Sequence, residues 1–240
     1  MTDVVRPKSD TVRLLLHRIA REFAPATFAN SLGAEDMVLT DLIYTNGLPI
    51  EVFTLDTGRL PNETYALIDA IAVRYGVRLR VLFPRSEAVE TFVKSHGVNG
   101  FHAGVELRKA CCQIRKVEPL GRALAGKKAW ITGLRRAQSV TRGGLTVESF
   151  DGEHGLMKFN PLADWSEEEV WSYIRASQVP YHALHDRGYP SIGCSPCTRA
   201  VAPGEDIRSG RWWWERPESR ECGLHPGPDG RLERAREETV

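Results

Sequence analysis

The sequence predicts an α/β protein whose β-sheet is mostly parallel and is covered by helices on both faces. Short apolar runs rich in β-branched and aromatic residues alternate with amphipathic stretches of about a dozen residues. Turn signals such as Asn46-Gly47 and Asp56-Thr57-Gly58 separate these segments. The chain has 240 residues, enough to bury one substantial core, so a single domain is expected over residues 1–240.

The first half of the chain carries the alternation most clearly. An amphipathic helix is expected over residues 11–23, because Val12, Leu16 and Ile19 share one face. A strand over residues 26–30 follows, and then a helix that ends at Asn46-Gly47. The same pattern next predicts a strand over residues 50–55, a helix over residues 62–75 and a strand over residues 78–83.

The second half begins with the same pattern and then loses it. A helix is expected over residues 109–124, a strand over residues 129–132 and short extended segments within residues 146–160. Ser166 can cap a helix that runs to Ala176. Beyond Val179, Pro and Gly become frequent, so the C-terminal part should be rich in loops.

Composition and charge place the chain among ordinary globular proteins. Hydrophobic residues make up 42% and charged residues 26%, and the formal net charge of +1 favours neither nucleic acid nor membrane as a partner. No apolar run is long enough to cross a membrane or to act as a secretory signal. We therefore expect a cytoplasmic protein whose five cysteines serve metal binding or catalysis and not disulfides.

The loop after the first expected strand is a candidate anion site. It contains Ser31, Gly33 and Asp36 at the point where a strand gives way to a helix. Backbone N–H groups at such a helix start can bind a phosphate or sulfate. A strand–Gly–helix turn also occurs for packing reasons alone, so this loop is not decisive by itself.

Four of the cysteines form two close pairs, Cys111-Cys112 and Cys194–Cys197. Four thiolates suit either a tetrahedral zinc ion or an iron–sulfur cluster. Neighbouring residues on a helix project about 100° apart, so an adjacent pair converges poorly on one ion. The separate iron corners of a cubane accept sulfurs from divergent directions, and the spacing therefore favours iron–sulfur over zinc.

Cys222 stands apart from the pairs, in Arg-Glu-Cys-Gly-Leu-His near the C-terminus. A thiol in a polar segment is a plausible nucleophile, and His225 and nearby arginines could lower its pKa. The alternative is an exposed cysteine without a role.

Several motifs together resemble the assimilatory sulfonucleotide reductases. The motifs run in order from about residue 27 to residue 225 and include Ser-Leu-Gly-Ala-Glu-Asp-Met-Val-Leu at 31–39, Leu-Asp-Thr-Gly at 55–58, Cys-Cys-Gln-Ile-Arg-Lys-Val-Glu-Pro-Leu at 111–120, Thr-Gly-Leu-Arg-Arg at 132–136, Lys-Phe-Asn-Pro-Leu-Ala-Asp-Trp at 158–165, Tyr-Pro-Ser-Ile-Gly-Cys-Ser-Pro-Cys-Thr at 189–198, Gly-Arg-Trp-Trp-Trp-Glu at 210–215 and Glu-Cys-Gly-Leu-His at 221–225. The resemblance implies an adenine nucleotide α-hydrolase-like fold of the PP-loop type.

The resemblance also implies an activity. Members of the family that carry both cysteine pairs reduce adenosine 5′-phosphosulfate (APS) to sulfite and AMP with a four-iron (4Fe-4S) cluster. They use a thioredoxin-like dithiol donor. The cluster ligands would be Cys111, Cys112, Cys194 and Cys197, and Cys222 would be the catalytic nucleophile, carried on a mobile segment over about residues 200–240. The residues that match substrate-binding positions are Ser31, Gly33, Lys116, Arg135, Arg136, Arg208, Arg211 and His225.

Other readings remain open at this stage. The 3′-phosphorylated nucleotide (PAPS), or both nucleotides, could be the substrate. An ATP pyrophosphatase-type ligase would use magnesium and would not need Cys222, but the first loop departs from the Ser-Gly-Gly-x-Asp-Ser form of those enzymes. A zinc module that binds nucleic acid would need a broad basic face, which the near-zero net charge opposes. The oligomeric state is left open, and an assembly of identical copies is one option.

Overall fold

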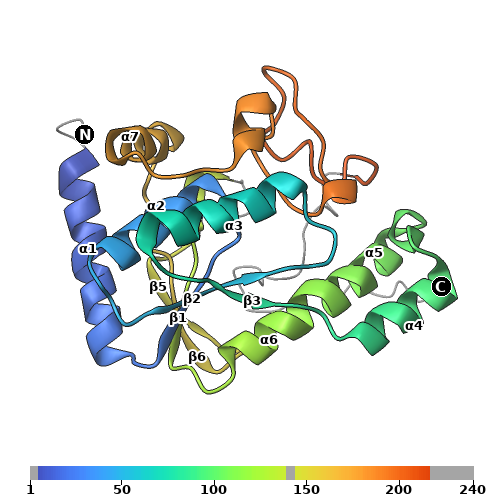
Figure 1. Cartoon of the computed structure of the whole chain (residues 1–240), viewed down its shortest axis with the longest axis horizontal. Helices are drawn as coiled ribbons and strands as arrows, with labels where there is room; N and C mark the ends of the chain where they lie inside the picture. The colour runs from blue at the N-terminus through green and yellow to red at the C-terminus, as the bar shows by residue number, and fades with distance from the viewer. Residues whose placement is uncertain (1–4, 139–143, 217–240) are drawn as a thin grey trace.

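The computed structural model describes residues 5–138 and 144–216 and contains a six-stranded sheet with the order β3-β2-β1-β4-β6-β5. All neighbouring strands pair in parallel except β5, which is antiparallel to β6. The predicted α/β fold with a mostly parallel sheet is confirmed (Figure 1). The strands are β1 (Ala26–Ala29), β2 (Glu51–Leu55), β3 (Arg80–Leu82), β4 (Ala129–Ile131), β5 (Glu148–Asp151) and β6 (Leu156–Phe159).

The helices agree with most of the expected elements. The α-helices are α1 (Val5–Glu22), α2 (Ala34–Thr45), α3 (Asn62–Tyr75), α4 (Ser86–His96), α5 (Val105–Cys112), α6 (Glu118–Leu124) and α7 (Glu167–Ser177). The helix α1 begins six residues before the expected start, and its buried Val5 and Ser9 extend the apolar face. The helix α4 was not expected, although Val89, Phe92 and Val93 are spaced as on one face of a helix; Phe92 is its one buried residue.

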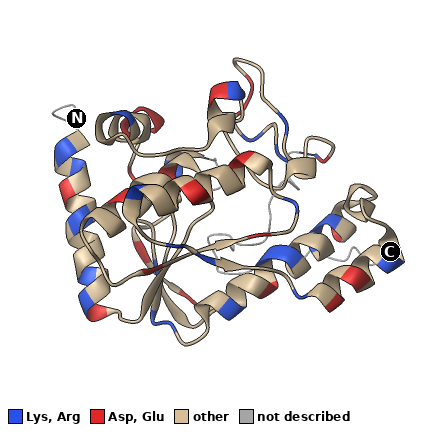
Figure 2. Ribbon diagram, viewed as in Figure 1, with Lys and Arg blue, Asp and Glu red and all other residues tan. Residues whose placement is uncertain are grey.

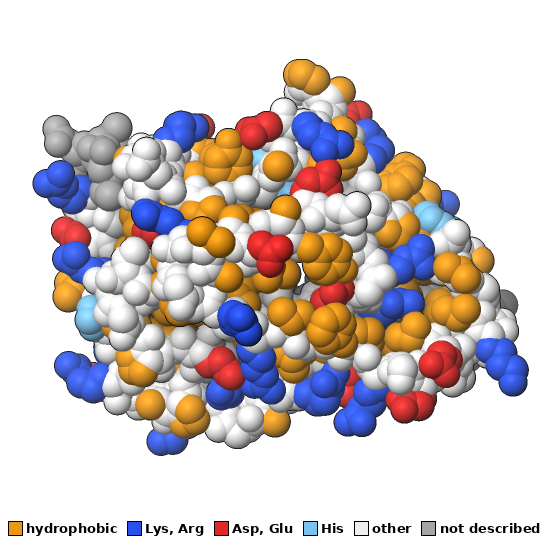
Figure 3. All heavy atoms as spheres, in the orientation of Figure 1, with side chains coloured by type: hydrophobic (Ala, Val, Ile, Leu, Met, Phe, Trp, Pro, Cys, Tyr) orange, Lys and Arg blue, Asp and Glu red, His pale blue; other side chains and the backbone are white. Residues whose placement is uncertain are grey.

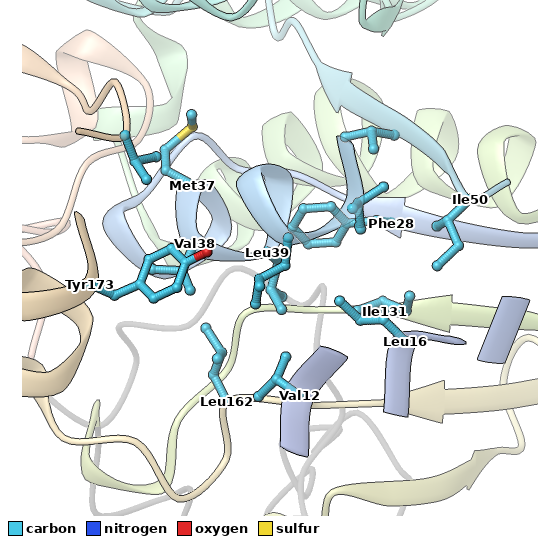
Figure 4. Close-up of a cluster of buried hydrophobic side chains, with 14 of the residues drawn as sticks. Val12, Leu16, Phe28, Met37, Val38, Leu39, Ile50, Ile131, Leu162 and Tyr173 are labelled. Atoms are coloured by element: carbon cyan, nitrogen blue, oxygen red, sulfur yellow. The ribbon is translucent and has the colours of Figure 1, made fainter. Parts of the chain in front are cut away.

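Helices pack on both faces of the sheet because successive strand residues point to opposite sides. Phe28 lies opposite Val52 and Ile131 in the neighbouring strands, and all three belong to a large apolar core with α1, α2, α3 and α7. Figure 4 shows part of this core between α1, α2 and the sheet. On the other face, Phe53 and Trp130 join a smaller core with α6.

The strand order places a ligand-binding position between β1 and β4. The chain moves outward from β1 to β3 and then returns to lay β4 on the other side of β1. In open parallel sheets, ligands bind at the carboxyl ends of the strands where this reversal occurs. The loops over residues 30–33 and 132–135 meet there.

The predicted 109–124 helix is longer and is interrupted by a π-helical turn. The helix begins at Val105, passes through η2 (Gln113–Val117) and continues as α6 to Leu124 (Figure 1). Such turns are rare in proteins overall, and many of those that occur lie at functional sites. This one directly follows Cys112 and includes Arg115 and Lys116.

The helix α7 begins as the sequence predicts. Ser166 accepts a hydrogen bond from the Glu169 N–H, and the Glu169 side chain accepts one from the Ser166 N–H. This reciprocal capping box satisfies two backbone donors at the helix start.

The C-terminal part is rich in loops, as expected, with short turns at η5 (Ala183–Arg187) and η6 (Ser195–Cys197). The predicted segment over residues 200–240 is described up to Arg216, and Cys222 and His225 lie outside the described residues. Among the described helices, none is long and apolar enough to span a membrane.

Candidate active site

A cavity of about 710 Å³ lies at the carboxyl ends of β1 and β4. Its wall combines the loop after β1, the loop after β4, the π-helical turn and the C-terminal loops. The predicted substrate-binding residues that line it are Ser31, Gly33, Lys116, Arg135, Arg208 and Arg211. Sequence positions as far apart as 31 and 211 therefore meet at one cavity.

Arg136 does not line this cavity. Its Nε donates a hydrogen bond to the Leu145 carbonyl at 2.6 Å, and its guanidinium also pairs with Asp164. Of the Arg135-Arg136 doublet, the structure therefore brings only Arg135 to the large cavity. A substrate-binding role for Arg136 stays a prediction.

The loop after β1 is organised by Asp36, a residue without an assigned role in the sequence analysis. The backbone N–H and the hydroxyl of Ser31 donate to Asp36 Oδ2 at 2.5 and 2.6 Å. Leu32 adopts a positive φ of 66°, and its N–H donates to Asn30 Oδ1 at 2.7 Å. Burial raises the pKa of Asp36 to about 7, while the hydrogen bonds from Ser31 oppose the shift.

Gly133 brings the loop after β4 against this carboxyl. Its backbone N–H donates to Asp36, and a Cβ at this position would lie 2.0 Å from Asp36 Oδ1. A side chain at position 133 would therefore displace the Asp36 carboxylate. The two loops that form the floor of the cavity are thus fixed to each other.

Arg135 is buried but remains at the cavity wall. Its Nε donates to Glu35 Oε1 at 2.8 Å, and its Nη1 donates to the Trp165 carbonyl at 3.3 Å. Only 4% of the Arg135 side chain is exposed, so its position is set by these partners. A guanidinium whose position is fixed in this way is well suited to binding a phosphate or sulfate.

Arg211 approaches the cavity from the C-terminal side. Its Nη1 donates to the Ile192 carbonyl at 3.2 Å, and its guanidinium lies 4.7 Å from the Trp212 ring centroid. A Cβ at Gly193 would lie 2.3 Å from Arg211 Nη2, so a side chain at position 193 would have to displace this guanidinium. Arg208 lies three residues earlier and is half-buried.

The four paired cysteines line a second, smaller cavity. Cys111 and Cys112 reach it from the end of α5, and Cys194 and Cys197 reach it from the η6 turn. All four are free thiols. Among residues 5–138 and 144–216, no three His, Cys, Asp or Glu side chains form a group that could hold a metal ion.

The surroundings of the thiols are mostly cationic and hydrogen-bonding. Thr57 Oγ1 lies 3.2 Å from Cys194 Sγ, and the Thr57 carbonyl accepts a hydrogen bond from Arg115 at 2.6 Å. Burial raises the pKa of Cys197 to about 12, with Cys194 adding to the shift and Lys116 opposing it. Burial also raises the pKa of Cys111, against the effect of Arg115.

Trp212 contributes a buried donor to the same place. It lines the thiol cavity and is 1% exposed, and its Nε1 has no hydrogen-bond partner among the described residues. A buried donor without a partner is costly unless a ligand accepts its hydrogen bond. Lys116 and Trp212 line both cavities, so the two cavities share a wall.

Residues 210–215, which we call the strap, contribute Trp212 to the wall of the thiol cavity and end at a buried ion pair. Arg108 on α5 pairs with Glu215 at 2.7 Å. Burial would lower the pKa of Arg108, but the neighbouring Glu215 carboxylate and Cys112 thiol raise it. The sequence analysis did not single out Arg108 or Glu215, although a glutamate directly after three tryptophans is a visible signal.

Charged groups on the surface are mixed. Figure 2 shows Lys and Arg along α5 and α6 with acidic residues between them, and Figure 3 shows cationic, acidic and apolar side chains interspersed on this face. The described residues on this face form no broad basic surface, and the large cavity is lined by acidic side chains such as Glu35 and Glu205 as well as by the cationic ones named above.

Comparison with known proteins gives a family and close relatives. Residues 25–200 match the phosphoadenosine phosphosulfate reductase domain. The chain is 54% identical to an adenosine 5′-phosphosulfate reductase of Allochromatium vinosum, over 93% of this chain and 88% of that protein. It is 52% identical to the protein of the same name from Burkholderia cepacia, over 94% of this chain and 90% of that protein.

Solved structures agree on the fold. A phosphoadenylyl-sulfate (PAPS) reductase from Candida auris, in complex with phosphate, is 28% identical with a TM-score of 0.68 and covers 84% of this chain and 98% of that one. Yeast FAD synthetase is 15% identical with a TM-score of 0.53, over 83% of this chain and 69% of that one. The similarity to FAD synthetase shows the fold alone. This fold is the PP-loop type that the sequence predicts.

Proposed function

The chain belongs to the phosphoadenosine phosphosulfate reductase family, and we propose that it reduces adenosine 5′-phosphosulfate to sulfite and AMP in sulfate assimilation. The observation that carries this proposal is the pairing of two adjoining cavities, one lined by arginines and the other by four thiols. Relatives at 52–54% identity bear the name of this activity. Cytoplasmic placement, where thiols stay reduced, belongs to the same proposal.

We also propose that Cys111, Cys112, Cys194 and Cys197 hold a 4Fe-4S cluster. Their four thiols line one cavity, and four thiolates are the ligand set of a cubane cluster. The buried indole N–H of Trp212 and the hydroxyl of Thr57 could donate hydrogen bonds to the sulfurs of the cluster. A bound cluster would supply rigidity and local charge to the shared wall, while the electrons come from thiols.

The large cavity suits a sulfonucleotide. The Ser31–Gly33 loop would take the phosphate or sulfate, and Arg135 would neutralise charge on it. Lys116 projects from the π-helical turn and lines both cavities, so it can meet the sulfate at the end nearest the cluster. Arg208 and Arg211 would enclose the anion from the C-terminal side, together with His225.

The chemical step would use Cys222 as the nucleophile. Its thiolate attacks the sulfonyl sulfur, an S–S bond forms, the bond from sulfur to the phosphate oxygen breaks, and AMP leaves with that electron pair. A thiolate of thioredoxin or a similar dithiol protein then attacks Cys222 Sγ, and sulfite leaves with its electron pair. The second donor thiol resolves the mixed disulfide, so the dithiol is oxidised by two electrons in all.

The proposal is tested by incubating the protein separately with ³⁵S-labelled APS and with the ³⁵S-labelled 3′-phosphorylated nucleotide. With ³⁵S-labelled APS and no thiol donor, the protein should retain label on Cys222, and Cys222→Ser should abolish both the label and sulfite release. Full sulfite production by Cys222→Ser would contradict the assignment. Equal kcat/KM for the 3′-phosphorylated nucleotide would establish a dual-specificity enzyme, the alternative closest to this proposal.

A further inference from the structure

We propose that the buried ion pair between Arg108 and Glu215 positions the nucleophile. It fastens the strap to the cysteine-bearing helix and so limits where Cys222 can go. This inference rests on the proposed function, in which Cys222 attacks the nucleotide. Arg108 lines the thiol cavity beside Cys112, but neither Arg108 nor Glu215 lines the large cavity or is a proposed cluster ligand, so toward Cys222 they are positioning residues.

The side chains of Arg108 and Glu215 are held in one defined geometry. Arg108 Nε donates to Glu215 Oε1 at 2.9 Å and Nη2 donates to Oε2 at 2.7 Å, which makes a bidentate contact between residues 107 positions apart. Their side chains are 1% and 3% exposed. A well-packed apolar pair in such a place is often as stable as an ion pair, so the ion pair is better explained by the geometry it imposes.

Neighbouring contacts fix the strap on the same support. The Arg108 guanidinium lies 4.8 Å from the ring centroid of Trp212, and the backbone N–H of Trp212 donates to the Cys197 carbonyl at 3.2 Å. The Trp214 ring lies 4.2 Å from the His102 ring, between centroids. The strap is thus attached to both cysteine-bearing segments, and Glu215 is its final attachment before Arg216, where the described residues end.

The chain length turns this attachment into a restraint on Cys222. Cys222 is seven residues after Glu215, so a fully extended chain places it no more than about 25 Å away. Arg211 and Trp212, which line the large cavity, lie on the same strap. A tether fixed this close to the cavity gives the thiol a high effective concentration at the bound nucleotide.

The test compares single-turnover labelling of Cys222 in four proteins. Because a lone buried charge can disturb folding, the main variant removes both charges, Arg108→Met/Glu215→Leu. We expect its labelling by APS to slow by about 10²-fold, the effect of misplacing a reacting group. Arg108→Lys keeps the charge but loses the bidentate fork and should fall between this variant and the wild type.

Three further readouts separate positioning from general damage. In the double variant, AMP affinity, iron content and the rate of Cys222 alkylation by iodoacetamide should match the wild type, because neither residue lines the large cavity, all four proposed cluster ligands are retained and the thiol of Cys222 is retained. Tyr75→Phe is the matched control, since it removes a buried hydrogen bond to Asp41 far from the strap. It should lower stability without slowing the labelling.

Each contrary result has a definite meaning. Wild-type labelling in the double variant would overturn the inference, and so would an equal slowing in Tyr75→Phe. Loss of iron from the double variant would overturn it too, because the pair would then support the cofactor. If the wild-type protein formed no adduct on Cys222, the proposed function would fail together with this inference.

Discussion

Two regions of this protein are held together by different forces. The core between the sheet and the helices α1, α2 and α7 is mainly apolar, with Leu16, Phe28 and Ile131 fully buried, and the polar Asp41 within it accepts hydrogen bonds from tyrosines. The region from residue 190 to residue 216 has little regular structure and is held by Arg108–Glu215, by guanidinium contacts with Trp212 and by backbone bonds. The first region needs only its sequence to fold, whereas the second also needs correctly paired charges and, in our proposal, a cofactor.

The largest effect should come from removing one proposed cluster ligand. Cys197→Ser should lower the iron content from about four per chain and reduce sulfite production by more than about 10²-fold, since even outer-shell changes cost up to that much. Amide hydrogen exchange should become fast in residues 190–216 and stay slow in β1 and α2. Unchanged iron content would contradict the cluster assignment, and equal loosening of both regions would remove the distinction between them.

The opposite experiment weakens the apolar core. Leu16→Ala removes a fully buried side chain and should lower the free energy of unfolding by about 2–5 kcal/mol, measured by urea denaturation. Iron content and kcat/KM per folded molecule should stay at the wild-type values, because α1 does not line either cavity. A parallel loss of iron would show that the two regions depend on each other.

A pH series tests the buried carboxyl between the two regions. Burial raises the pKa of Asp36 from 3.8 to about 7. Because the folded pKa lies above the unfolded pKa, the folded state binds this proton more tightly, and Asp36 increasingly opposes folding as the pH rises from about 4 to 7. Asp36→Asn does not titrate, so its free energy of unfolding relative to wild type should rise across this window, by at most about 4 kcal/mol.

Leu16→Ala is the control for this series. Its effect on the free energy of unfolding should be independent of pH, because no titratable group is removed. A flat difference between Asp36→Asn and the wild type from pH 4 to 7 would contradict the raised pKa.

Much of the fold could be predicted because local patterns and tertiary structure agree. Helix α3 has the predicted bounds, and the strands β1, β2 and β4 lie within the predicted runs. The helix α4 was missed even though Val89, Phe92 and Val93 stand at helical spacing, so this part of the pattern was present in the sequence. The antiparallel pairing of β5 was not predicted, although the short connection at Asp151-Gly152 permits only antiparallel pairing with β6.

The site could be predicted in its residue types but not in its internal contacts. The motif residues Ser31, Lys116 and Arg211 line one cavity, as their order along the strands and loops suggested. The contact of Gly133 with Asp36 depends on two loops about 100 residues apart, and no local pattern encodes such an approach. Likewise, nothing in the sequence pairs Arg108 with Glu215.

The π-helical turn between α5 and α6 has a consequence for insertions and deletions. A π turn is equivalent to an α-helix with one extra residue, so deleting one residue from Gln113–Val117 would restore regular α geometry. Each residue of an α-helix advances about 100° around its axis. Because the extra residue is absorbed within the turn, such a deletion would leave Cys111 and Cys112 in phase with Leu120 and would instead change whether the Arg115 and Lys116 side chains reach the cavities. The length of this segment is as constrained as its composition, and single-residue gaps here should be far less tolerated than in the loops that flank the helix.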